Sequence, residues 1–299
     1  MLGRLDGRLL HSPAQDIWLA RARLRGASTI AGLAGVPVSV KQLQDWICGR
    51  TPPPRHSEGL NDPLSVAALF HFAASAGESK RDPVAQATLN LARTLLDDRA
   101  EAALWGEDDL LRFGPVWRDA QARLSAPYPA ASLVHVAERL IDAQRAASAP
   151  VAPALVVTAF DGRQLHIDPR TANLGWITAC HLPRAWQAAG MTVHALPNLT
   201  FLPRFLPEDP LDLADYLGRA IVREAQHGLA DLDLLEAAVR RLPKDQAWTR
   251  RSKAPLLMRM ELSYPGLRLP AIARLLGISH QGATKLAAQV RQAMDMASD

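Results

Sequence analysis

The sequence predicts a mainly α fold with a C-terminal helix-turn-helix. A small central β-sheet is also expected, so that a minor part of the fold is α+β. Three patterns support this prediction. Apolar residues recur at helical spacing over most of the 299 residues. Near the middle, an Asp-Gly pair separates a β-branched run from a short alternating run, and near the end a glycine separates two short amphipathic segments. The apolar share of 48% is enough for a sizeable core.

A chain of this length suits two or three domains. Residues 1–104 are expected to form an N-terminal helical domain. Residues 105–240 are expected to form a central domain that contains a β-hairpin, and residues 241–299 contain the helix-turn-helix.

The N-terminal region is dominated by helical patterns. Segment 16–34 repeats apolar residues from Ile17 to Ile30 at helical spacing. Ser39 is a suitable N-cap for a following helix, because its hydroxyl can accept a hydrogen bond from a backbone amide. Segment 51–63 predicts a loop, since its four prolines cannot continue a helix. Further helices are expected over 64–76, 84–96, 117–124 and 131–146.

The central region changes character at "ALVVTAFDGRQLHI", residues 154–167. An Asp161-Gly162 turn between a β-branched run and a short alternating run is a strong hairpin signal, because both turn residues must adopt positive φ. Residues 191–196 are expected to add a third strand to the sheet. Two helices are then expected over 213–226 and 232–242.

Charge is distributed unevenly along the chain. From Arg240 to Asp299 there are eleven basic and four acidic residues, an excess of seven positive charges, whereas the whole chain carries +4. The first 239 residues are therefore net negative by three. A basic terminal region on a slightly acidic body is typical of a polyanion-binding protein. The alternative is a solvated basic surface without a partner.

The last 30 residues fit the requirements of a helix-turn-helix, whose two helices pack steeply around a tight turn. Gly277 supplies the turn, Ser279 can cap the second helix, and Pro270 stands where a first helical turn accepts proline. Small or apolar residues fill the joint between the helices: Ile272, Ala273, Leu276, Ile278, Ala283 and Leu286.

The second helix is expected to carry DNA-binding side chains. Gln can pair bidentately with adenine, and His, Ser, Thr and Lys can donate to base edges or phosphates. No Asp or Glu occurs from Leu267 to Ala293. The alternative is a structural helical hairpin, on which Glu and Lys would more often alternate. The expected outward residues are Ser279, His280, Gln281, Thr284 and Lys285.

Four further basic residues are expected to touch phosphates, namely Arg250, Arg251, Lys253 and Arg274. The predicted partner is double-stranded DNA. One such helix covers only a few base pairs, so a homodimer on a two-fold site is expected.

The C-terminal motif resembles bacterial helix-turn-helix transcriptional regulators. More of the chain, through "RLDGRL" (4–9), "WICGRTPPPRHSEGLNDPLSVAALFHF" (46–72) and the terminal motif, resembles a bacterial family that combines an uncharacterised central domain with a C-terminal helix-turn-helix. This resemblance implies a regulator-like DNA-binding protein. It implies no ligand and no catalytic residue.

The segment "ASTIAGLAGVPVSVKQL" resembles the N-terminal helical segment of Fic-family proteins, which often carries Ser-Xaa-Ile-Glu-Gly. Ala31 stands where that glutamate would be, and the family's His-Pro-Phe-Xaa-Xaa-Gly-Asn-Gly-Arg loop is missing. The resemblance therefore implies a related layout without nucleotide-transfer chemistry.

Other candidate sites are weaker. His166, Cys180, His181 and His194 raise the question of zinc, but their spacing matches no compact ligand pattern, and neighbouring side chains at 180 and 181 would diverge on a strand. No metal or other cofactor is expected. A polar loop is interpreted as a helix-capping turn, with a small-molecule effector site as the alternative. That loop contains Arg55, His56, Ser57, Glu58, Asn61 and Asp62.

The sequence thus predicts a sequence-specific DNA-binding protein, a transcriptional regulator and not an enzyme. With no secretory signal, no apolar run of about 20 residues and only two cysteines, it is expected to be cytoplasmic and nucleoid-associated. Two alternatives stay open. The terminal unit could tether an enzyme or mobile-element factor to DNA, or it could be a protein-interaction module.

Overall fold

The computed structural model describes residues 1–51, 67, 70–71, 82–87, 116–147, 155–158, 163–167, 175–243, 248–249 and 251–296. It is mainly helical, at 70%. The helices are α1 (Leu2–His11), α2 (Gln15–Leu33), α3 (Val40–Ile47), α7 (Leu133–Ala147), α8 (Gly175–Ala188), α9 (Pro210–Arg240), α10 (Ala254–Ser263), α11 (Leu269–Leu276) and α12 (His280–Met296), with further helical stretches at 83–87 and 116–125.

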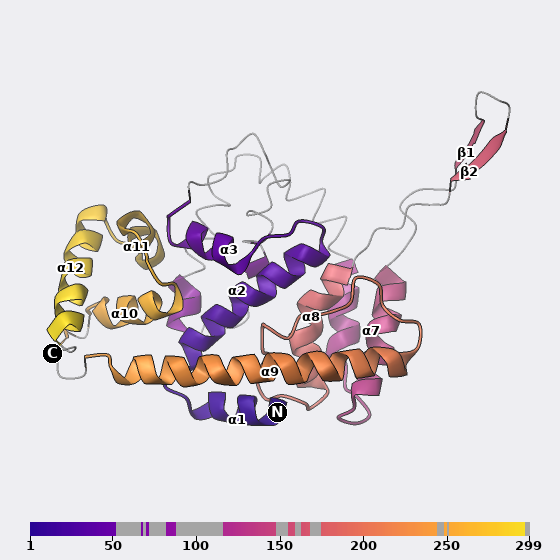
Figure 1. Ribbon diagram of the computed structural model, residues 1–299, viewed down its shortest axis with the longest axis horizontal. Coiled ribbons are helices and arrows are strands. Elements are labelled where there is room, and N and C mark those ends of the chain that lie inside the picture. Colours follow the sequence, from indigo (N-terminus) through magenta and orange to yellow (C-terminus); the bar gives the residue numbers. More distant parts are fainter. Residues whose placement is uncertain are drawn as a thin grey trace.

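The expectation of a small central β-sheet was wrong, and the class is all-α. Strands β1 (Leu155–Thr158) and β2 (Gln164–Ile167) pair only with each other in an antiparallel ladder. Figure 1 shows this pair away from the helices. Residues 191–196 form an irregular loop and add no strand. The loop is held instead by Asp6, which accepts hydrogen bonds from the backbone amides of Val193 and His194.

Several helical expectations are confirmed. α2, α3 and α7 lie where the periodicity predicts them, and 116–125 covers the stretch expected at 117–124. Ser39 forms a complete capping box with Gln42, in which the serine oxygen accepts from the Gln42 amide at 3.2 Å and the glutamine oxygen accepts from the Ser39 amide at 2.9 Å.

The two helices expected over 213–226 and 232–242 are one helix, α9, of 31 residues. Gly228 lies inside this helix, and it is there for a packing reason. The Trp18 indole donates to the Gly228 carbonyl at 2.8 Å. A β-carbon at position 228 would lie 2.9 Å from Leu5 and 3.0 Å from Trp18, so the close approach of α1 and α2 requires glycine there.

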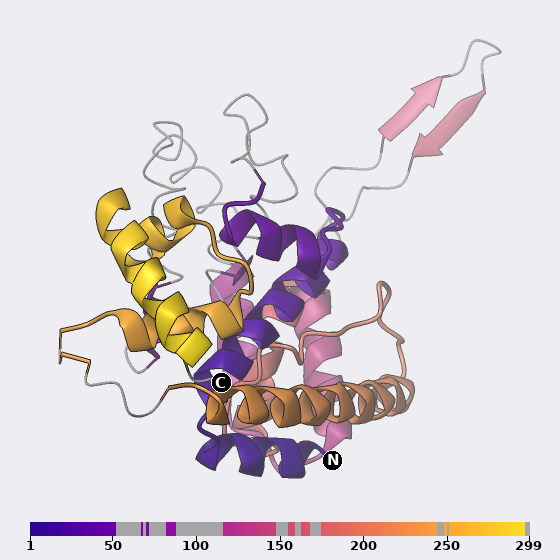
Figure 2. The same ribbon diagram turned by 60° about the vertical axis from the view of Figure 1, so that its left-hand side comes forward.

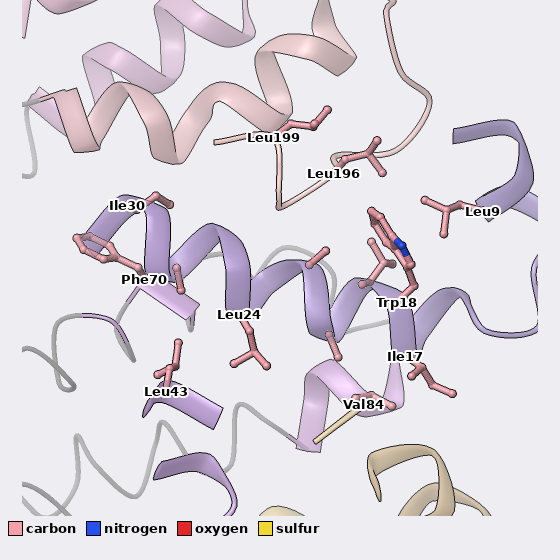
Figure 3. Close-up of a cluster of buried hydrophobic side chains, with 14 of the residues drawn as sticks. Leu9, Ile17, Trp18, Leu24, Ile30, Leu43, Phe70, Val84, Leu196 and Leu199 are labelled. Carbon is pink, nitrogen blue, oxygen red and sulfur yellow. The ribbon is translucent and has the colours of Figure 1, made fainter. Parts of the chain in front are cut away.

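A single hydrophobic cluster extends from Leu2 to Val290 and includes buried residues of α1, α2, α9, α10 and α12. α2 runs through its middle, as Figures 1 and 3 show. Trp18 and Leu24 on α2 are almost fully buried, and Leu196 and Leu199 of the loop before α9 pack into the same cluster. The C-terminal helices therefore share a core with the N-terminal ones. The three-domain division stays a prediction.

Among the described residues, no helix has the length and apolar character needed to cross a membrane.

Candidate nucleic-acid interface

The turn between α11 and α12 has the geometry that the sequence predicts. Gly277 ends α11 in the left-handed conformation, with φ 58° and ψ 49°, where other residues are strained. Pro270 lies in the first turn of α11. The Ser279 side chain accepts from the Gly282 amide at 3.1 Å and so caps α12. A tight turn of fixed shape therefore sets the direction of α12.

α12 has two clearly different faces. Ala283, Ala287, Val290 and Ala293 are buried, the first three of them in the shared core, and α12 packs on both α10 and α11. These residues recur every three or four positions, which is one stripe of a helix. The opposite face is exposed. Figures 1 and 2 both show α12 at an edge of the molecule, with no described helix covering its outer side.

The exposed face of α12 is polar and lacks carboxylates through residue 293. It contains the predicted His280, Gln281, Thr284 and Lys285, all exposed. The Thr284 hydroxyl donates to the His280 carbonyl at 3.0 Å, so its oxygen is left to accept hydrogen bonds. Ser279 is also exposed, but its oxygen already caps the helix.

Three exposed residues farther along α12 were not expected as site residues. Gln289 and Gln292 continue the stripe of Gln281 and Lys285 at steps of three or four residues, and Arg291 lies beside them. Extending the helical spacing of Gln281 and Lys285 by two turns along the sequence would have predicted that these residues share the exposed face.

The four predicted phosphate-binding residues lie in different settings. Arg274 is exposed in the last turn of α11, and Arg251 is exposed before α10. Lys253 donates from Nζ to the Leu276 carbonyl, so its ammonium binds the C-terminal end of α11. Its position next to the turn suits a residue that supports α12. Arg250 lies outside the described residues.

α10, which the sequence patterns did not predict, ties α11 and α12 to the N-terminal helices. Arg259 on α10 forms an ion pair with Asp16 on α2, with 2.6 Å between Nε and Oδ2. It also donates to the Pro13 carbonyl at 2.6 Å. From α2, the Arg21 guanidinium donates to the Leu262 carbonyl at 2.7 Å. The three C-terminal helices are thus fixed on α2 by charged contacts as well as by the core.

The histidines and cysteines weighed as zinc ligands are dispersed. Cys180 and His181 lie on helix α8, not on a strand. Burial raises the pKa of the Cys180 thiol and lowers that of His181 to about 4. His194 instead bonds Asp6, at 2.7 Å from Nδ1. In the described ranges no three His, Cys, Asp or Glu side chains come together as metal ligands.

The polar loop with Arg55, His56, Ser57, Glu58, Asn61 and Asp62 lies outside the described residues, and its interpretation stays a prediction. Comparison with known proteins adds no assignment: no family model, no curated protein and no solved structure matches the chain. The resemblances to bacterial regulators and to Fic-family proteins therefore stay predictions, and a function has to be inferred from the residues of the chain itself.

Proposed function

We propose that this protein binds double-stranded DNA through the exposed face of α12 and acts as a transcriptional regulator. The observation that carries the proposal is the composition of that face. It combines amide, hydroxyl and imidazole groups with Lys285 and has no carboxylate through residue 293, while the opposite face is buried on α10 and α11.

The geometry suits the major groove, which admits one α-helix. In a helix-turn-helix, N-terminal residues of the second helix meet base edges and the first helix crosses the phosphate backbone. Gln281 is the second residue of α12 and lies in its first turn, where an amide side chain can pair with the N6 and N7 atoms of adenine. Lys285, one turn further on, is suited to phosphate or guanine.

A regulator of this kind reads a two-fold DNA site as a homodimer, because one such helix contacts too few base pairs for specificity. The fixed attachment of α10 to α2 supports this arrangement. If two copies associate through their bodies, the spacing of their α12 helices is set by the protein and not by a flexible linker.

The experiment is capture of fragmented genomic DNA by the full-length protein, followed by sequencing, beside a Gln281→Ala/Lys285→Ala variant. Both substituted side chains are exposed, so the fold should be retained, which circular dichroism checks. We expect a palindromic motif with wild type and loss of that motif with the variant. Equal recovery of all fragments by both proteins would contradict sequence-specific binding.

A further inference from the structure

A second basic surface lies next to the start of α11. It consists of Lys41 on α3, Arg50 just after α3, and Arg268 at the N-cap of α11, and is called here the α3 edge. All three residues are exposed or half-exposed, and the exposed fraction of the side chain is 84% for Lys41 and 36% for Arg50. They come from segments more than 200 positions apart in the sequence, so only the fold brings them together.

Short contacts hold α3 against the segment that leads into α11. The Arg268 amide donates to the Cys48 carbonyl at 3.0 Å, and Arg50 donates from Nη2 to the Pro265 carbonyl at 3.2 Å. Gly49 has φ +70°, and a β-carbon there would lie 3.3 Å from that of Ala271. This part of the N-terminal body therefore takes a fixed position beside α11.

Among the described residues, two carboxylates lie near the α3 edge, and both are already engaged. Asp45 is shared between Lys41, at 2.6 Å, and Arg50, at 2.8 Å. Glu261 is half-buried and close to the backbone amides of Gly266 and Leu267. Three cations against these two anions give the described part of the edge a net positive charge, and its cationic side chains reach solvent.

We propose that the α3 edge is a second, sequence-independent contact with the phosphate backbone of duplex DNA. This inference rests on the proposed function of α12. When a reading helix lies in the major groove, the helix before it crosses the adjacent phosphate backbone. The start of α11 then lies beside a phosphate strand, and the α3 edge is fixed to the start of α11.

Asp45 has a definite role in this arrangement. It holds Lys41 and Arg50 in place and also offsets part of their charge. Removal of the Asp45 charge should therefore strengthen DNA binding, whereas removal of either cation should weaken it. A purely structural role for these ion pairs predicts no gain from the loss of Asp45.

The test measures the affinity of full-length protein for a duplex of about 30 base pairs across a range of salt concentrations. The logarithm of the binding constant falls linearly with the logarithm of the salt concentration. For each phosphate contact that is lost, this slope becomes shallower by about 1. We expect the slope to become shallower by about 1 for Lys41→Gln and by about 2 for Lys41→Gln/Arg50→Gln. Each variant should lose the same affinity for the captured motif as for an arbitrary sequence. Asp45→Asn should bind at least about twofold more tightly.

The matched control is Arg219→Gln on α9. Arg219 is 74% exposed and forms a helical ion pair with Asp215 at 2.8 Å, as Lys41 does with Asp45. The Arg219→Gln variant should show the same dependence of DNA affinity on salt concentration as wild type. Because Lys41 is so exposed, a fold defect would not explain an effect of its substitution.

The two proposals fail in different ways. If Gln281→Ala/Lys285→Ala abolishes binding while the Lys41 and Arg50 variants keep the wild-type slope, the α3 edge is not a DNA contact and the proposed function stands. If wild type shows no salt-dependent binding to any duplex, both proposals are wrong. If Asp45→Asn binds no more tightly than wild type, the charge argument for the edge is overturned.

Discussion

α9 and α12 are both long amphipathic helices, but their exposed faces differ in kind. α9 mixes signs, with ion pairs such as Asp215–Arg219 within the helix and Arg8–Asp233 to α1. α12 exposes glutamines, a histidine, a threonine and a lysine, with no carboxylate through residue 293. Mixed charges satisfy one another and keep a helix solvated. The described face of α12 through residue 293 has no carboxylate of its own to pair with its positive charge.

The largest expected effect comes from giving α12 the acidic character of α9. Gln281→Glu/Lys285→Glu places two carboxylates where phosphates are expected, and like charges across an interface cost several kcal/mol. We expect at least about a hundredfold weaker binding to duplex DNA by fluorescence anisotropy. The matched pair on α9, Arg219→Glu/Gln226→Glu, should stay within about twofold of wild type. Similar losses for both pairs would mean that only net charge matters.

Two buried histidines should make the stability of the folded protein depend on pH, in contrast to the exposed face of α12. Burial lowers the pKa of His71 to about 3 and that of His181 to about 4, below the usual 6.5. Below pH 6.5 the unfolded chain takes up protons that the folded chain refuses, so stability is lost as pH falls from 6.5 toward 4. At pH 5 each histidine should cost about 2 kcal/mol.

Urea unfolding at pH 7.5 and pH 5 measures this loss. His181→Phe should remove about half of the difference between the two pH values. An unchanged difference in that variant would show that His181 is accessible to protons in the folded protein.

Substitutions of two glycines within α9 measure how tightly this helix packs against its neighbours. Gly228→Ala should destabilise the protein by about 1–3 kcal/mol, because the added methyl group clashes with Leu5 and Trp18. Gly218→Ala meets only Leu133, at 3.4 Å, and should be neutral or stabilising by up to about 1 kcal/mol, as alanine favours helix. Denaturant midpoints measure both. Equal effects of the two substitutions would contradict the close packing of α1 and α2 on α9.

The smallest expected effects separate two roles on α12. Gln281→Ala should relax preference at one or two base pairs by about tenfold or less, while affinity for arbitrary DNA changes little. Lys285→Ala should instead weaken binding to every sequence and lower the salt slope by about 1. Selection from a randomised duplex library measures the first effect and salt titration the second. Unchanged base preference in Gln281→Ala would remove that residue from the readout.

Local patterns predicted what depends on local chemistry. The N-cap at Ser39, the left-handed glycine at 277 and the cap at Ser279 are each set by residues within four positions, and each is confirmed. The exposure of Gln281 and Lys285 follows from the same periodicity. Their role in DNA binding stays a proposal.

Tertiary contacts decided the features that the sequence missed. The strand expected at 191–196 is a loop, because Asp6 of α1, nearly 190 positions away, accepts the amides of Val193 and His194. Position 228 inside α9 requires glycine, because Leu5 and Trp18 occupy the space beside it. The α3 edge could not be predicted, since nothing near Lys41 or Arg50 in the sequence indicates that they lie next to Arg268.

Whether α12 binds a polyanion is tested most directly by the affinity of the wild-type protein for duplex DNA as a function of salt concentration. Side chains on α11, α12 and the α3 edge offer at least four phosphate contacts, so the log–log slope should be about −4 or steeper. No binding, or a slope near zero, would contradict the account, and the polar face of α12 would then need another partner.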